Sequence, residues 1–213
     1  DILFYSKTVG ISYVEVDVLI SNDSIPFVGH DWKYLEKKLQ ITKSYDSTHL
    51  AETYYKDGQN ITFLSTLLKK HQFLILDLIH NTAKDQKKII NYLYKKFPKV
   101  ILSNVYLQID NIRMYKYIES INPKILMSYN YRTKNTRYWR KNWILQMKPY
   151  FDNVDMFVIN PSARIGRKMI RDFGEHAHKI IPVIYKNNIQ EIQRMVDLGF
   201  QFLMIDDVIT ITN

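Results

Sequence analysis

Two acidic residues lie one residue apart in an apolar, β-branched segment, and a His-Asp pair follows them after a polar break. The segment reads YVEVDVLISNDSIPFVGHD over residues 13–31, with Glu15 and Asp17 as the acids and His30-Asp31 as the pair. Side chains of a strand alternate between its two faces, so Glu15 and Asp17 project from the same side. Burying two neighbouring carboxylates without a partner costs free energy. That side is therefore either open to water or occupied by a cation.

A third acid lies inside another apolar segment. Asp77 is the central residue of LILDLIH, residues 74–80. Helix capping does not explain an acid in the middle of a strand. Together with Glu15 and Asp17 it offers hard oxygen ligands, the kind that Mg²⁺ and Ca²⁺ prefer. The three acids therefore predict a site for one of these ions.

Short apolar segments of strand length recur along the chain. They cover residues 13–20, 74–79, 105–109, 125–129, 156–159, 180–185 and 202–205. They are nearly continuous rather than alternating, which is typical of parallel strands covered on both faces. Segments with helical spacing lie between them. We expect Asp110 to cap one such helix, and Glu191 and Gly199 to mark the start and the end of another.

This alternation of strands and helices predicts an α/β fold with a parallel sheet. The seven segments fit a TIM-type (β/α)8 barrel that is short by one unit. A doubly wound open sheet is the competitor, but it would show a glycine-rich turn after its first strand. The chain has only 6 glycines, and none of them form such a cluster. We therefore predict one barrel domain over residues 1–213.

Composition excludes some classes of function. The chain has 213 residues and no cysteine, which removes disulfides and thiolate chemistry. No segment approaches the roughly 20 apolar residues that span a bilayer. The formal net charge of +9 is a mild sign of an anionic partner. The sequence does not determine the compartment: the cytoplasm is slightly favoured, and a secreted mature form stays open.

The segment GISYVEVDVLISNDSIPFVGHD resembles the glycerophosphodiester phosphodiesterase family. That family's segment reads roughly Gly-Ala-Asp-x-Ile-Glu-x-Asp-Val, then a polar turn with an Asp, then Val-x-x-His-Asp. The residues in register are Gly10, Glu15, Asp17, Val18, Asp23, Pro26, His30 and Asp31. The similarity continues weakly through FLSTLLKKHQFLILDLIH and IPVIYKNNIQEIQRMVDLGFQFLMIDD.

The resemblance implies a metal-dependent hydrolase that converts glycerophosphodiesters, or a related lipid- or polymer-derived diester, to glycerol phosphate and an alcohol. Asp17 would bind Mg²⁺ or Ca²⁺ with Glu15 beside it, and Asp77 stands where the family's third-strand glutamate binds the ion. His30 matches a catalytic histidine that exchanges a proton with the leaving or attacking oxygen. The candidate substrate-binding residues are His80, Gln108, Tyr185 and Lys186.

The chain also departs from the family pattern. The family's first strand ends in His-Arg-Gly and is followed by Glu-Asn, whereas this chain begins at Asp1, inside the helix that follows. A third-strand lysine is replaced by Ile79, a late tryptophan by Tyr185, and a glutamate by the shorter Asp77. The chain is then either an active enzyme shortened at its N-terminus or a degenerate relative. We favour the first, because a barrel without its first strand has two unpaired edges.

One stretch indicates a different class of function. Residues 131–143, YRTKNTRYWRKNW, interleave basic and aromatic side chains and contain no acid. Such a stretch suits lipid headgroups or nucleic-acid backbones, and it is also compatible with an ordinary solvated loop. The alternative function is therefore a non-catalytic module that binds anionic membrane or nucleic-acid surfaces. In the enzyme, the stretch would hold the small phosphodiester or rest on a membrane, and nucleic acid is not the expected partner.

Overall fold

The computed structural model describes residues 13–54, 58, 60–70, 73–131, 150–159, 171, 173–184, 189–200 and 203–205. The chain divides into two compact units, Asp1–Leu126 and Met127–Asn213, and each is described by itself. The single domain over residues 1–213 stays a prediction. Residues 132–143 of the basic-aromatic stretch, together with Tyr185 and Lys186, lie outside the described residues.

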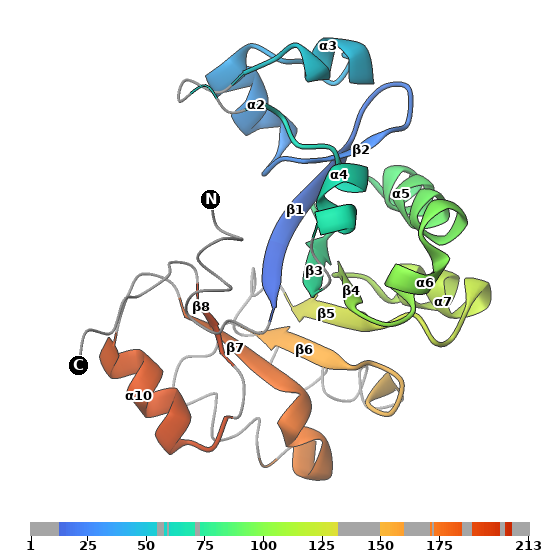
Figure 1. Cartoon of the computed structure of the whole chain (residues 1–213). Coiled ribbons are helices and arrows are strands. Elements are labelled where there is room, and N and C mark those ends of the chain that lie inside the picture. The colour runs from blue at the N-terminus through green and yellow to red at the C-terminus, as the bar shows by residue number, and fades with distance from the viewer. Residues whose placement is uncertain are drawn as a thin grey trace. The chain divides into compact units, whose positions relative to one another are not determined.

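The sheet of the first unit has the strand order β2-β1-β3-β4 (Figure 1). Its strands are β1 (Val14–Ile20), β2 (Pro26–Val28), β3 (Leu74–Asp77) and β4 (Val105–Ile109). β1, β3 and β4 run parallel to one another, whereas β2 pairs with the end of β1 in the antiparallel direction. Because β1, β3 and β4 are parallel, their register determines which polar side chains of neighbouring strands lie next to each other.

The two faces of the three parallel strands differ in chemistry. Asp17 pairs in register with Asp77, and Asp77 pairs with Gln108, so these three polar side chains form one row on one face. On the other face, side chains such as Leu76 and Leu107 are fully buried. Burial of this apolar face stabilises the sheet, and the polar row is left on the opposite face.

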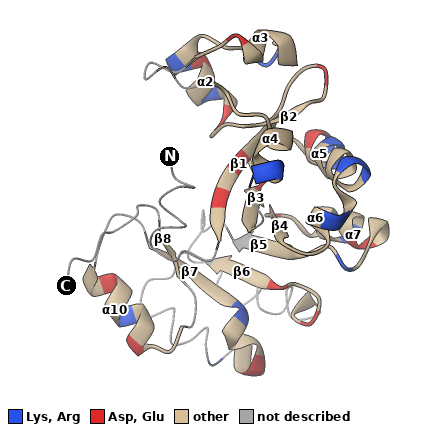
Figure 2. Cartoon of the chain, viewed as in Figure 1, with Lys and Arg blue, Asp and Glu red and all other residues tan. Residues whose placement is uncertain are grey.

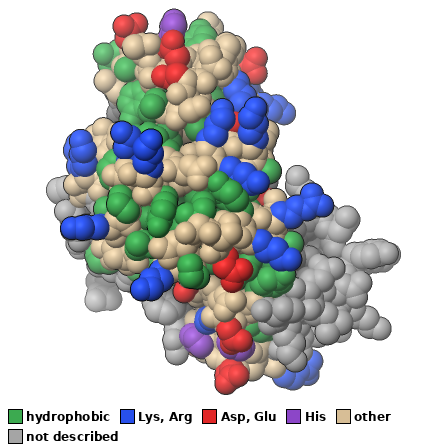
Figure 3. All heavy atoms as spheres, turned by 90° about the vertical axis from the view of Figure 1, so that its right-hand side faces the viewer, with side chains coloured by type: hydrophobic (Ala, Val, Ile, Leu, Met, Phe, Trp, Pro, Cys, Tyr) green, Lys and Arg blue, Asp and Glu red, His purple; other side chains and the backbone are tan. Residues whose placement is uncertain are grey.

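Three amphipathic helices add further buried apolar side chains to this unit. They are α5 (Ala83–Lys96), α6 (Pro98–Ile101) and α7 (Ile112–Ile121), and Figure 1 shows them side by side. In α5, Thr82 caps the N-terminus, and Ile89, Ile90 and Leu93 are buried. Figure 3 views the right-hand side of Figure 1 and shows Lys and Arg side chains spread over that surface, with apolar side chains between them.

An excursion between β1 and β3 has a small core of its own. Besides β2 it contains α2 (Trp32–Leu39), α3 (Ser47–Ala51) and α4 (Leu64–Lys70). Its buried side chains are Leu19, Phe27, Leu35, Ile41, Leu50 and Ile61. Leu19 belongs to β1, so this core ties the excursion to the strand that carries Glu15 and Asp17. The excursion also carries His30, between β2 and α2.

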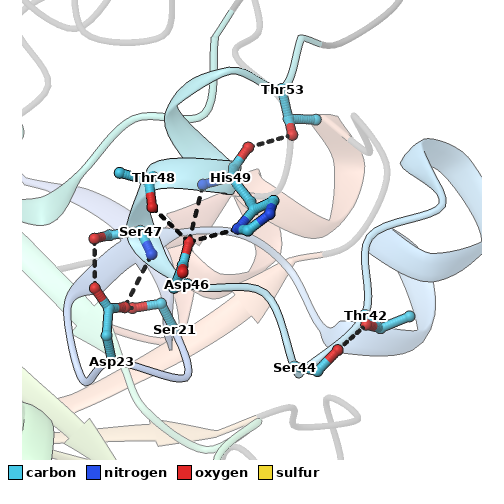
Figure 4. A network of polar contacts seen from close by, with 9 residues as sticks. All are labelled: Ser21, Asp23, Thr42, Ser44, Asp46, Ser47, Thr48, His49 and Thr53. Atoms are coloured by element: carbon cyan, nitrogen blue, oxygen red, sulfur yellow. Dashed lines mark hydrogen bonds and ion pairs between the residues drawn. The ribbon is translucent and has the colours of Figure 1, made fainter.

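Hydrogen bonds fasten the turn before β2 to the start of α3 (Figure 4). The Asp23 carboxylate accepts from the Ser47 backbone N–H at 2.9 Å and from the hydroxyls of Ser21 and Ser47. Asp46 caps α3: its Oδ1 accepts from the His49 backbone N–H at 3.0 Å and from His49 Nδ1 at 2.6 Å. These bonds give the surface of the excursion a defined conformation.

The Asp46–His49 pair makes a testable prediction about titration. The hydrogen bond from the His49 backbone holds the pKa of Asp46 below its ordinary 3.8, and the Asp46 side chain raises the pKa of His49 above 6.5. The contribution of Asp46 to stability is therefore present above pH 3.8 and is lost as pH falls through its lowered pKa. The contribution of His49 is present below pH 6.5 and is lost as pH rises through its raised pKa.

We expect Asp46→Asn to lower the pKa of His49 toward 6.5, because the neutral amide no longer favours the imidazolium. The shift is measured by NMR titration of the His49 ring protons. The matched control is Glu36→Gln, an exposed substitution on α2 that should leave this titration as in the wild type. An unchanged His49 titration in Asp46→Asn would contradict the pairing.

The sheet of the second unit consists of β5 (Met127–Tyr131), β6 (Met156–Ile159), β7 (Ile180–Ile184) and β8 (Met204–Ile205), in that order. All of its strand pairs are parallel. The described residues also include the 3₁₀ helix η2 (Gly174–Lys179) and α10 (Ile189–Asp197). Phe151, Phe157 and Phe173 pack ring against ring beside β6, with Phe151 and Phe173 stacked at 4.3 Å between centroids.

Each predicted strand segment overlaps an observed strand, but some predicted details are wrong. The three-residue β2 was not predicted. Asn111, not Asp110, caps α7: its Oδ1 accepts from the backbone N–H groups of Arg113 and Met114. Gly199 follows the end of α10, as predicted, with a left-handed φ of 89°. Among the described helices, none has the length and apolar character needed to cross a membrane.

Candidate active site

Three carboxylates meet on the polar face of the first unit's sheet. Glu15 and Asp17 lie on β1 and Asp77 at the end of β3, and one oxygen of each lies within 4.8 Å of the others. Figure 2 shows the acidic positions of β1 in red on a strand that otherwise carries no charge. The structure thus brings together the three acids that the sequence singles out. That they bind a metal stays a prediction.

The surroundings of Asp77 fix its orientation. Its side chain is buried, Oδ1 accepts from the Ile79 backbone N–H at 2.8 Å, and Oδ2 accepts from Gln108 Nε2 at 2.9 Å. A carboxylate has about four lone-pair positions, and these two bonds engage one position on each oxygen of Asp77. An oxygen-rich cluster with an oriented carboxylate fits Mg²⁺ or Ca²⁺.

Gln108 is held in the interior by this contact. Only 1% of its surface is exposed, and its amide reaches the buried carboxylate from the neighbouring strand. Asp77 is therefore one observed partner of Gln108, which takes the position of an outer residue that orients a metal ligand. Its predicted contact with substrate stays a prediction.

His30 lies next to this cluster because the chain returns along β1. The Gly29 backbone N–H donates to the Asp17 carbonyl at 3.0 Å, which ties the residue before His30 to the strand of the acids. The His30 imidazole is 59% exposed, so a solute can reach it. The structure therefore places the predicted catalytic histidine at an accessible position near the carboxylates.

Asp31 orients that imidazole, a role that our sequence analysis missed. Its Oδ1 caps α2 by accepting from the Tyr34 backbone N–H at 2.6 Å, and its Oδ2 accepts from His30 Nδ1 at 2.8 Å. The bond from Tyr34 and the contact with His30 hold the pKa of Asp31 below its ordinary value, so it stays ionised near neutral pH. With Nδ1 bound, Nε2 is the nitrogen left for chemistry. The sequence did contain a signal for this role, because Asp31 directly follows a histidine and directly precedes a helix.

His80 joins the site from the loop after β3. Its Nε2 lies 3.6 Å from Asp17 Oδ1, and its ring centroid lies 5.0 Å from that of His30. Asn81 anchors the loop, since its Nδ2 donates to the Val18 carbonyl at 2.6 Å. His80 therefore contacts Asp17 and His30, while a contact with substrate stays a prediction for it, as for Tyr185 and Lys186.

Solved structures resemble this chain over nearly its whole length. A glycerophosphodiester phosphodiesterase from Agrobacterium tumefaciens matches with a TM-score of 0.72 at 15% identity, covering 95% of this chain and 87% of that one. A glycerophosphoryl diester phosphodiesterase from Parabacteroides distasonis matches with a TM-score of 0.63 at 16% identity, covering 91% of this chain and 72% of that one. The glycerophosphoryl diester phosphodiesterase domain of a Mycobacterium tuberculosis protein matches with a TM-score of 0.66 at 9% identity, covering 96% of this chain and 88% of that one.

The chain has the fold of the glycerophosphodiester phosphodiesterases. This likeness confirms the predicted α/β fold of the TIM-barrel type. No protein-family profile matches the sequence, and no curated protein matches it. Within the glycerophosphodiester phosphodiesterase fold of this chain, Glu15, Asp17 and Asp77 meet on one sheet face, and His30 follows β2.

Proposed function

We propose that the chain acts as a metal-dependent phosphodiesterase that hydrolyses glycerophosphodiesters, or related diesters derived from lipids or polymers, to glycerol phosphate and an alcohol. The observation that carries the proposal is the meeting of three carboxylates beside two histidines. Solved structures that share the fold are described as glycerophosphodiester phosphodiesterases, which supports this chemistry over other uses of a carboxylate cluster.

Glu15, Asp17 and Asp77 would hold the divalent ion. When bound, Mg²⁺ or Ca²⁺ supplies positive charge that stabilises the charge developing on the phosphodiester oxygens. The contribution of the protein is to orient the ligands: Gln108 and the Ile79 backbone N–H fix Asp77. Parallel pairing of β1 with β3 keeps Asp17 opposite Asp77.

His30 would move the proton. Its Nδ1 is engaged with Asp31, so Nε2 is free to donate a proton to the leaving alkoxide oxygen or to take one from the attacking hydroxyl. Asp31 keeps the ring in that orientation, while the cap of α2 fixes Asp31 in turn. General acid–base catalysis of this kind contributes typically about 10²–10⁴-fold to the rate.

The proposal is tested by assaying the release of glycerol 3-phosphate from glycerophosphocholine and a panel of other glycerophosphodiesters. We expect turnover that EDTA abolishes and that added Mg²⁺ or Ca²⁺ restores, because the carboxylates act through the ion. The control is EDTA already saturated with Ca²⁺, which should leave turnover unchanged. Turnover that is insensitive to EDTA, or no turnover across the panel with either ion, would reject the proposal.

A further inference from the structure

A second group of donor atoms lies beside the all-oxygen cluster. One donor atom each of Asp17, His30 and His80 lies within 4.8 Å of the others. The closest printed pair, His80 Nε2 and Asp17 Oδ1, is 3.6 Å apart. Two ligands of a tetrahedral Zn²⁺, with bonds of about 2.0–2.1 Å, lie roughly 3.3 Å from each other. This pair is therefore already near the spacing of ligands to a common ion.

The chemistry of this group differs from that of the carboxylate cluster. Two imidazoles and one carboxylate suit Zn²⁺ and similar transition metals, whereas Mg²⁺ and Ca²⁺ prefer oxygen ligands alone. His30 also has the support that metal-binding histidines usually have: its Nδ1 donates to the Asp31 carboxylate at 2.8 Å, which leaves Nε2 to bind an ion. Asn81 anchors the loop of His80 to β1.

We propose that Asp17, His30 and His80 form a second metal site, selective for a borderline divalent ion such as Zn²⁺. Asp17 belongs to both groups, so its carboxylate lies between the oxygen-rich site and this nitrogen-containing one. The site is accessible to an ion from solution, because 59% of the His30 side chain is exposed.

The site has a consequence for activity that rests on the proposed function. An ion bound to His30 Nε2 occupies the nitrogen that the proposed proton transfer uses. Zn²⁺ would therefore inhibit hydrolysis supported by Mg²⁺ or Ca²⁺. The binding itself does not depend on the proposed function and is tested without any assay of activity.

The experiment is a calorimetric titration of the whole protein with Zn²⁺, in the presence of excess Mg²⁺ to occupy oxygen-rich sites. The variants are His30→Asn and His80→Asn, and His49→Asn is the matched control. His49 is also exposed and also paired with a carboxylate, but it lies outside the cluster. We expect the wild type and His49→Asn to bind equally, and the other two to bind at least about tenfold more weakly.

A second readout uses Co²⁺, whose visible absorption reports nitrogen ligands and coordination number. We expect the absorption of the Co²⁺-loaded wild type to weaken in His30→Asn and His80→Asn and to persist in His49→Asn. Circular dichroism confirms that each variant is folded, and the exposure of His30 makes its substitution safe for the fold. Equal Zn²⁺ affinity in all four proteins, or no Zn²⁺ binding by the folded wild type, would overturn the proposal.

Discussion

Replacing Asp17 by Asn is expected to lower the rate of glycerophosphodiester hydrolysis by roughly 10³-fold or more. The substitution keeps the size of the side chain and removes the charge from the centre of the carboxylate cluster. A metal ion contributes several kcal/mol of transition-state stabilisation, and each 1.36 kcal/mol is tenfold in rate. The measurement is kcat/KM over a range of Mg²⁺ and Ca²⁺ concentrations, together with the affinity for the ion.

The control for Asp17→Asn is Glu36→Gln, which removes an exposed carboxylate of α2 away from the cluster. It should leave both the rate and the metal affinity as in the wild type, since isolated surface charges contribute little. A folded Asp17→Asn variant with the wild-type rate and metal affinity would show that the carboxylate cluster is not a metal site.

Replacing His30 by Gln is expected to lower kcat by about 10²–10⁴-fold, the usual contribution of general acid–base catalysis. The affinity for Mg²⁺ or Ca²⁺ should change little, because His30 is not in the group formed by Glu15, Asp17 and Asp77. The two variants therefore differ in what they change. Asp17→Asn should lower both the metal affinity and the rate, whereas His30→Gln should lower the rate alone. Initial rates at saturating metal and an independent metal titration measure both quantities.

His49→Gln is the control for His30→Gln, because His49 is an exposed histidine bound to a neighbouring carboxylate in the same unit. It should keep full activity. A His30→Gln variant that turns over at the wild-type rate would exclude proton transfer by His30, even if the enzyme still requires a metal.

The sequence by itself determined where most strands lie and that Glu15 and Asp17 share one side of a strand. A short apolar segment is a local signal, so the sequence located β1 and β3 to β8 to within a few residues. The two-residue spacing of Glu15 and Asp17 put both on one side of β1. Local signals had their limits. Neighbouring Asp110 and Asn111 are both good capping residues, and only the hydrogen bonds select Asn111. A strand as short as β2, beginning with proline, has no periodicity to detect.

The tertiary structure decided which distant residues meet. Asp77 lies opposite Asp17, and Gln108 opposite Asp77, because of the register of β1, β3 and β4. Register depends on how whole faces pack, and a slip of one residue would turn Asp77 to the apolar side. Likewise, His80 reaches Asp17 and His30 only because β1 and β3 are neighbours, and no local pattern encodes that contact. The sequence therefore identified the residue types that can do chemistry, and long-range packing determined which of those side chains lie in contact.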